Sequence, residues 1–320
     1  MTSPVWQRWA QPGVILIGTD LSDLDRLMPY VLAEAAESGA RLVLLHVLAA
    51  RASLSADATG MPYYDIEGAL EFAEKALEPW CELARQHGIQ CDALVREGGT
   101  TEQIAAAVRQ FQADRVVVGT RSRSKLGKLL LGSVAEQVLR SVNLPVMTVG
   151  PEAHLAVETQ VAGEAQGLVL HATSLRETSR PSAALACEIA GSLGARLVLL
   201  HVLPPGDGHE RSGMPARMDS AVLEELRKLA AETGANASCR VEPLVMHGNP
   251  SVEILAAAAE RHASLIVLGA KQHSTFENLT RDRTVYRVLA HARCPVLTIR
   301  ELMAAESETE SAPMVHSARD

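Results

Sequence analysis

Two identical segments determine how this chain is organised. Gly39–Leu48 reads GARLVLLHVL, and Gly194–Leu203 reads GARLVLLHVL again, 155 positions further on. A second matching pair, Asp114–Gly150 and Ser264–Arg300, lies at an offset of 150 positions. A repeat period of this length indicates two copies of one domain rather than a solenoid of small units.

The chain has 320 residues, which is long enough for two domains of ordinary size. The repeats predict an N-terminal extension, a first domain, a linker, a second domain and an acidic tail. The extension is residues 1–12 and the first domain is residues 13–151. The linker is residues 152–166, the second domain is residues 167–301 and the tail is residues 302–320. The tail is expected to be solvated and mobile, because it is rich in acids and small polar residues.

Composition narrows the class of protein. Hydrophobic residues make up 47% and aromatic residues only 3%, so the cores must consist of Val, Leu, Ile and Ala. The net charge of −8 argues against a nucleic-acid-binding protein. The N-terminus lacks a signal-peptide pattern and no apolar run reaches the length of a membrane span, so a cytoplasmic location away from membranes is expected.

The cysteines are five in number and scattered, without a CxxC pair. This pattern suggests neither a disulfide framework nor a zinc site. They are predicted to be reduced and mostly structural. They are Cys81, Cys91, Cys187, Cys239 and Cys294.

Short apolar runs alternate with amphipathic segments through the first copy. The runs predict strands, and the segments between them predict helices. The predicted strands are Val14–Gly18, Leu42–Leu48, Cys91–Arg96, Arg115–Val118 and Val146–Val149. This order predicts an α/β fold in which each half is a doubly wound, mostly parallel, five-stranded sheet flanked by helices and is Rossmann-like. Ligands of such sheets bind at the carboxyl ends of the strands. Asp20, Val47 and the loop after Gly119 should therefore lie at one edge.

The loop from Gly119 to the helix expected at Ser133 is the segment most suggestive of chemistry. Free N–H groups at a helix start can hold a phosphate, and Gly132 lets a ligand approach the backbone. The loop carries four cations and no acid, which favours an anionic ligand: Arg121, Arg123, Lys125 and Lys128. An ordinary helix start with a solvated loop, and an Asp20 that only turns the chain, are the alternative interpretations.

These residues resemble the motif G-x2-G-x9-G-S/T of the ATP-binding branch of the universal stress protein family. Gly119, Gly132 and Ser133 match it, whereas Ser122 replaces the second glycine. The chain as a whole resembles a tandem universal stress protein with two adenine nucleotide α-hydrolase-like domains. The resemblance implies that the first domain binds ATP, with Mg²⁺ accompanying it. It also implies the binding residues Asp20, Val47, Val118, Gly119, Arg121, Ser122, Arg123, Gly132, Ser133 and Val134.

The second copy departs further from this motif. Gln272 replaces the middle glycine, Asp282-Arg283 replaces Gly-Ser, and the position of Asp20 falls near Ser174. Because Asp282 would place negative charge beside a phosphate, the second domain is not expected to bind ATP in this manner. The resemblance also implies that the last strands of the two domains, Val146–Val149 and Val296–Ile299, pair within the chain. A homodimer is a further arrangement that it allows.

No Walker, Rossmann GxGxxG or GxSxG motif is present, so a non-enzymatic stress-response or signalling protein is predicted, with no catalytic or metal-binding residues. His46 and His201, repeated at one fold position, are expected to be structural. Two alternatives stay open. One is an interaction module without nucleotide, which Ser122→Gly would test through a gain in affinity. The other is a weak ATPase.

Overall fold

The computed structural model describes most of the two predicted domains. The described residues are 5–48, 54–56, 62–120, 132–153, 167–176, 179–203, 214–234, 239–270 and 283–300. The acidic tail, most of the linker and the basic loop at 121–131 lie outside them. Within the described part of the chain, every helix is too short or too polar to be a transmembrane span.

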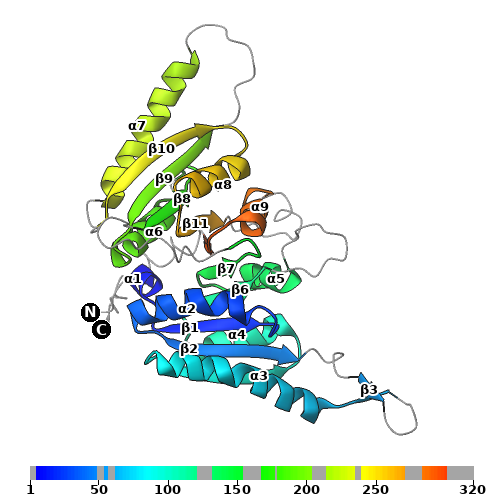
Figure 1. Cartoon of the computed structure of the whole chain (residues 1–320). Coiled ribbons are helices and arrows are strands. Elements are labelled where there is room, and N and C mark those ends of the chain that lie inside the picture. The colour runs from blue at the N-terminus through cyan, green and yellow to red at the C-terminus, as the bar shows by residue number, and fades with distance from the viewer. Residues whose placement is uncertain are drawn as a thin grey trace, which may run out of the picture.

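The first half begins with a short helix and then alternates strands and helices (Figure 1). Its elements are α1 (Val5–Ala10), β1 (Val14–Thr19), α2 (Leu24–Ser38), β2 (Arg41–Leu48), β3 (Leu54–Ala56), β4 (Pro62–Tyr64), α3 (Ile66–Gln86), β5 (Cys91–Glu97), α4 (Thr100–Phe111), β6 (Arg115–Gly119), α5 (Ser133–Ser141) and β7 (Val146–Val149).

The second half repeats this order without counterparts of α1, β3 and β4 among the described residues. Its elements are β8 (Leu168–Ala172), α6 (Arg180–Ser192), β9 (Arg196–Leu203), α7 (Met214–Gly234), β10 (Val241–His247), α8 (Pro250–Glu260), β11 (Leu265–Ala270), α9 (Arg283–His291) and β12 (Val296–Arg300).

The amphipathic patterns account for these elements, as α2 illustrates. Leu24, Leu27, Met28, Val31 and Ala35 recur at helical spacing and are all buried. Gly39 ends the helix in the left-handed conformation, at φ 71°, and donates its N–H to the carbonyl of Ala35. The sequence pattern thus fixes both the buried face and the end of this helix.

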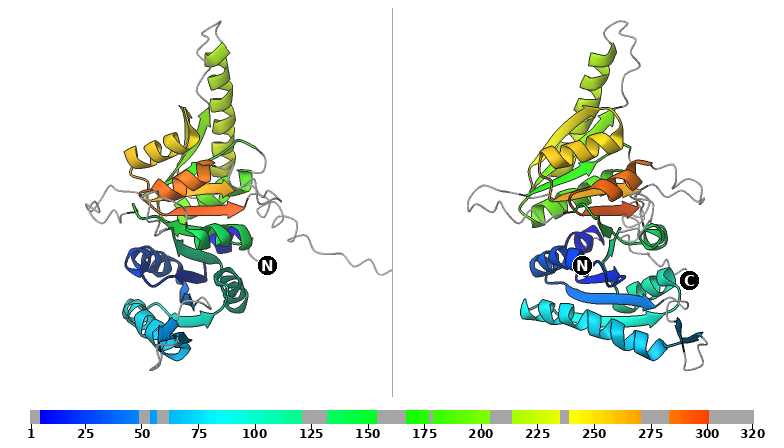
Figure 2. Two further views of the ribbon diagram at one scale, coloured as in Figure 1. Left: turned by 90° about the vertical axis from the view of Figure 1, so that its right-hand side faces the viewer. Right: turned by 45° about the vertical axis from the view of Figure 1, so that its right-hand side comes forward.

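The strands of both halves form one sheet. Its order is β10-β9-β8-β11-β12-β7-β6-β1-β2-β5, and all neighbours are parallel except β12 and β7. The predicted fold class is confirmed in each half. The two five-stranded sheets are, in addition, continuous with each other, which the views in Figure 2 show along the length of the molecule.

The junction between the halves is the antiparallel pair β7–β12. Leu297 lies opposite Met147, and the Thr148 hydroxyl donates to the carbonyl of Val296 at 3.2 Å. Arg300, at the end of β12, donates to the Asn143 side chain at 2.9 Å. The predicted intrachain pairing of the last strands is therefore confirmed. It leaves neither strand with an unpaired edge at the junction.

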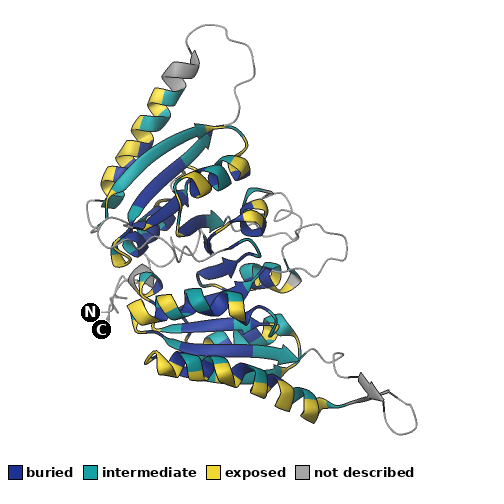
Figure 3. Ribbon diagram, in the orientation of Figure 1, coloured by how far each residue is buried: buried dark blue, intermediate teal, exposed yellow. Residues whose placement is uncertain are grey.

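The hydrophobic core differs between the two faces of the sheet. On one face α2 and α3 of the first half and α6 and α7 of the second half contribute to a single cluster of buried residues. On the other face α4 and α5 pack on one cluster, and α8 and α9 pack on a separate one. In Figure 3 the inner strands are mostly dark blue and the outer strand β10 is teal, and the helices that cover them carry yellow on their outer sides. The two halves thus share a core along one face only.

Helix α1 lies in the segment that the sequence predicted only as an extension. It packs against α6 of the second half, and Trp9 belongs to the shared core. The Arg8 side chain pairs with Asp114 at 2.5 Å, and Asp114 also accepts from the Gly13 N–H at 2.9 Å. This segment therefore contacts both halves.

One prediction about the cysteines is wrong. Cys187 in α6 and Cys239, just before β10, are joined by a disulfide, with their Cα atoms 6.3 Å apart. That separation is ordinary for a disulfide. Cys81, Cys91 and Cys294 are free and buried, as predicted. The pair is separated by 52 positions and follows no spacing motif, so only the fold brings it together, with α6 packed on β9, the neighbour of β10.

Candidate nucleotide-binding site

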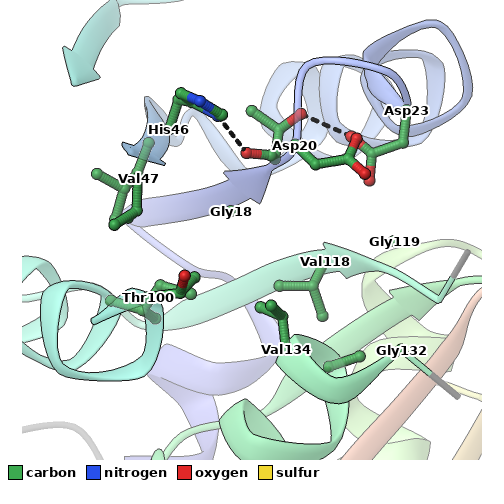
Figure 4. Close-up of a pocket in the computed structure, with 14 residues that line it drawn as sticks. Gly18, Asp20, Asp23, His46, Val47, Thr100, Val118, Gly119, Gly132 and Val134 are labelled. Carbon is green, nitrogen blue, oxygen red and sulfur yellow. Dashed lines mark hydrogen bonds between the residues drawn. The ribbon is translucent and has the colours of Figure 1, made fainter. Parts of the chain in front are cut away.

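A pocket of about 340 Å³ opens at the carboxyl ends of β1, β2 and β6. The sheet order reverses at β1, which makes this edge the switch point at which α/β sheets bind ligands. The starts of α4 and α5 close the pocket from the side (Figure 4). Its lining residues are Gly18, Thr19, Asp20, Asp23, Leu45, His46, Val47, Thr100, Ile104, Val118, Gly119, Gly132, Val134 and Ala135.

A tight turn after β1 positions Asp20 at the pocket. The Thr19 hydroxyl accepts a hydrogen bond from the Leu21 N–H at 2.9 Å, and Leu21 adopts a positive φ of 70°. The Asp20 carboxylate accepts from both the N–H and the hydroxyl of Ser22, at 2.9 and 2.7 Å. Asp20 therefore stabilises the turn and also lines the pocket. The side chain is exposed.

His46 connects the ends of β1 and β2. Its Nδ1 lies 2.9 Å from the carbonyl oxygen of Thr19. The repeated His201 makes the same contact, with its Nδ1 2.8 Å from the carbonyl oxygen of Thr173. This shared hydrogen bond supports the structural role predicted for both histidines. In the described residues no group of three or more histidines, cysteines or acids could hold a metal ion.

Asp23 lines the pocket and occupies the N-cap position of α2. Its side chain makes no capping bond. Its carboxylate instead accepts from the Thr19 hydroxyl at 2.6 Å. A Cβ on Gly119 would lie 2.2 Å from the Asp23 carboxylate, so this position must be glycine while Asp23 keeps its place. Burial raises the pKa of Asp23, and the nearby Asp20 raises it further.

Asp23→Asn is expected to stabilise the protein at pH 7 by on the order of 1 kcal/mol. Because the folded-state pKa of Asp23 is raised, wild-type stability falls as pH rises above the ordinary value of 3.8. The variant avoids this loss, since an amide oxygen can still accept from Thr19. Urea unfolding at pH 7 and pH 3 measures the difference, which should vanish at the lower pH. Asp25→Asn, an exposed change in the same helix, should stay within about 0.5 kcal/mol of wild type at pH 7. A destabilised Asp23→Asn at pH 7 would contradict this assignment.

The structure brings together six of the ten residues predicted for the site: Asp20, Val47, Val118, Gly119, Gly132 and Val134. Gly132 precedes α5 in an extended conformation, and the helix begins at Ser133, as predicted. Arg121, Ser122 and Arg123 lie outside the described residues, as does the side chain of Ser133.

The pocket residues that the sequence did not identify are mostly apolar or small. Thr100 and Ile104 belong to α4, and Ala135 to α5. Their only sequence signal was helical periodicity, which predicts burial but not which cavity a residue faces.

The turn after β8 in the second half repeats the geometry of the first. Leu175 has a positive φ of 57°, and its N–H donates to the Thr173 hydroxyl at 3.1 Å. Ser174 therefore occupies the position of Asp20. Its hydroxyl lies 2.9 Å from that of Ser179. The second half thus keeps the turn but lacks the carboxylate.

Together, the reversed sheet order and the pocket at its carboxyl edge define an open α/β protein whose pocket lies at the switch point of the sheet. Residues 13–150 and 168–300 each match the profile of the universal stress protein family. The chain belongs to that family, and its tandem organisation is confirmed.

Known proteins agree with this assignment. A universal stress protein of Mycolicibacterium smegmatis is 26% identical over 303 residues, which cover 89% of this chain and 96% of the relative. One from Thermus aquaticus is 33% identical over 139 residues, covering 42% of this chain and 96% of the relative. The crystal structure of a universal stress protein from Archaeoglobus fulgidus matches with a TM-score of 0.67 at 23% identity, covering 91% of this chain and 99% of that structure.

Proposed function

We propose that the first domain binds ATP in the pocket at the carboxyl ends of β1, β2 and β6, and that the protein acts in stress response or signalling without catalysing a reaction. The observation that carries this proposal is the convergence of Asp20, Val47 and Gly132, from three distant segments, on one pocket. Each was predicted from the sequence as a nucleotide-binding residue.

The chemistry of the three segments suits the three parts of the ligand. The Asp20 carboxylate lines the pocket and, as an acceptor group, can accept hydrogen bonds from ribose hydroxyls. The backbone of Val47, at the end of β2, offers a donor and an acceptor to the edge of adenine. The first N–H groups of α5 have no partner within the helix and face the side on which phosphates would bind.

The size of the pocket supports a ligand of this kind. Its volume of about 340 Å³ lies within the range of small-molecule sites, which starts near ~300 Å³. Arg121, Arg123 and Ser133 complete the proposal as phosphate partners, and Mg²⁺ would accompany the triphosphate. In the second half Ser174 and Asp282 replace groups on which this binding depends.

Val134→Trp is expected to weaken ATP binding by more than about 100-fold, or roughly 2.7 kcal/mol. Val134 lies in the first turn of α5, lines the pocket and is 37% exposed, so an indole can enter the pocket without displacing the core. Isothermal titration with ATP measures the effect. Thr284→Trp places the same side chain one residue into α9 of the second half and should leave the affinity unchanged.

Two further measurements separate this proposal from its alternatives. Asp20→Asn keeps an oxygen for the Ser22 turn and removes the charge, and it should weaken binding by about 10-fold. A wild-type protein that is purified without nucleotide and gives no heat on titration would leave the interaction module as the better interpretation. ATP turnover that Asp20→Asn abolishes would instead support the weak ATPase.

A further inference from the structure

The carboxylate of Asp23 lies in the wall of the pocket, between the turn after β1 and the end of β6. Its Oδ1 accepts from the Thr19 hydroxyl at 2.6 Å. Its Oδ2 lies so close to Gly119 that a Cβ there would be 2.2 Å away. In Figure 4 these two residues and Gly132 lie on the side of the pocket away from Val47. The phosphates of a nucleotide whose base lies at Val47 would therefore pass beside Asp23.

The charged groups that face Asp23 come from three segments. Asp20, in the turn after β1, repels its carboxylate, and Arg26 of α2 attracts it. The Nη2 atom of Arg26 is buried, and it would lie 3.0 Å from the same Cβ on Gly119. His46, at the end of β2, also lines the pocket. The residues that β6, α4 and α5 contribute to the described wall are uncharged.

An anion in the pocket would add negative charge beside a carboxyl group whose charged form is already disfavoured. Burial is the main cause that raises the pKa of Asp23, and the hydrogen bond from Thr19 opposes it. Asp23 is only 6% exposed, so water and salt screen its charge poorly. A like charge within ~6 Å raises the pKa of a carboxyl group further. A phosphate group would therefore favour the protonated form of Asp23.

We propose that Asp23 takes up a proton from solvent when the pocket binds a nucleotide polyphosphate, so that the affinity for ATP falls as pH rises. The proton adds to a carboxylate oxygen and removes one negative charge from the pocket wall. Because the complex then holds more protons than the free protein, binding is strongest at low pH. This inference rests on the ATP site proposed above and adds to it a residue that determines specificity by charge.

Isothermal titration with ATP in HEPES and in Tris at pH 7.5 measures the protons taken up, because the two buffers differ in ionisation enthalpy. Both titrations use one saturating concentration of Mg²⁺. Wild type is expected to take up at least about half a proton more per ATP than Asp23→Asn. Asp25→Asn removes the same charge from an exposed position in the same helix and should match wild type. Comparing proteins cancels the protons that ATP itself gains or loses.

The dependence of affinity on pH gives a second measurement. Asp23→Asn should bind ATP about as tightly as wild type at pH 5.5 and at least about 10-fold more tightly at pH 8, because its amide stays neutral. Carbon NMR of the Asp23 carboxyl group should show that its pKa rises when ATP is added.

Three results would overturn the inference, and they differ in what they say of the ATP site. ATP binding with equal proton uptake by wild type and Asp23→Asn would leave the site intact without the proton. Weaker binding by Asp23→Asn at both pH values would make Asp23 a ligand of the accompanying cation instead. No binding of ATP by any of the three proteins would overturn the site and the inference together.

Discussion

Glu34→Ala is expected to lower the free energy of unfolding by about 3–5 kcal/mol. Glu34 is the charge partner of Arg115, whose side chain is 2% exposed. Burial lowers the pKa of Arg115 to about 9, so the guanidinium still carries its charge at pH 7. Without Glu34 that charge would be left in the protein interior without a counterion. Urea unfolding at pH 7, followed by circular dichroism, measures the loss.

Two companion variants separate this effect from general damage to α2. Glu37→Ala removes an exposed acid from the same helix and should change stability by no more than about 0.5 kcal/mol. Glu34→Leu combined with Arg115→Met replaces both charges by hydrocarbon and should recover most of the loss. If the free energy of unfolding of Glu34→Ala alone lay within about 1 kcal/mol of the wild-type value, Arg115 would have to find another partner.

Opening the Cys187–Cys239 disulfide is expected to destabilise the second half by up to about 4 kcal/mol. The bond closes a loop of 52 positions, and the chain-entropy relation gives this value for a loop of that length. The cross-link connects a buried helix on one face to the entry of β10, an outer strand of the sheet. Denaturation with and without a phosphine reductant, followed by counting of free thiols, measures the difference.

The double variant Cys187→Ala/Cys239→Ala supplies the control. It should unfold like the reduced wild type and should not respond to reductant. Because the chain has two domains, the transition must be tested with several probes before one free energy is assigned. If reductant left the unfolding curve of the wild-type protein unchanged while the count of free thiols rose by two, the bond would contribute no stability.

Much of the fold could be predicted from local sequence patterns. The strand Val146–Val149 occurs with the predicted bounds, because an apolar run reports burial directly, and a helix begins at Ser133 as expected. Part of the candidate site followed from topology. Asp20 and Val47 follow neighbouring parallel strands, whose carboxyl ends must meet at one edge.

The features that were missed depend on contacts between distant parts of the chain. Helix α1 spans only six residues and is positioned by packing against α6 and by the pair of Arg8 with Asp114. Arg115 is charged and would ordinarily be solvated, yet it is buried and its partners come from α1 and α2. The Cys187–Cys239 bond likewise has no signal within one stretch of sequence.

The antiparallel junction of β7 and β12 has a consequence for how the molecule can change over generations. In a pair built from two identical chains, every substitution appears on both sides of the axis. Here the two halves are encoded separately, so equivalent positions can differ. Asp20 corresponds to Ser174 in the turn after the first strand of each half, and Ile17 in β1 corresponds to His171 in β8. One half can therefore lose or exchange a ligand-binding feature while the other half stays unchanged. The two halves always occur in a one-to-one ratio, because they belong to one chain.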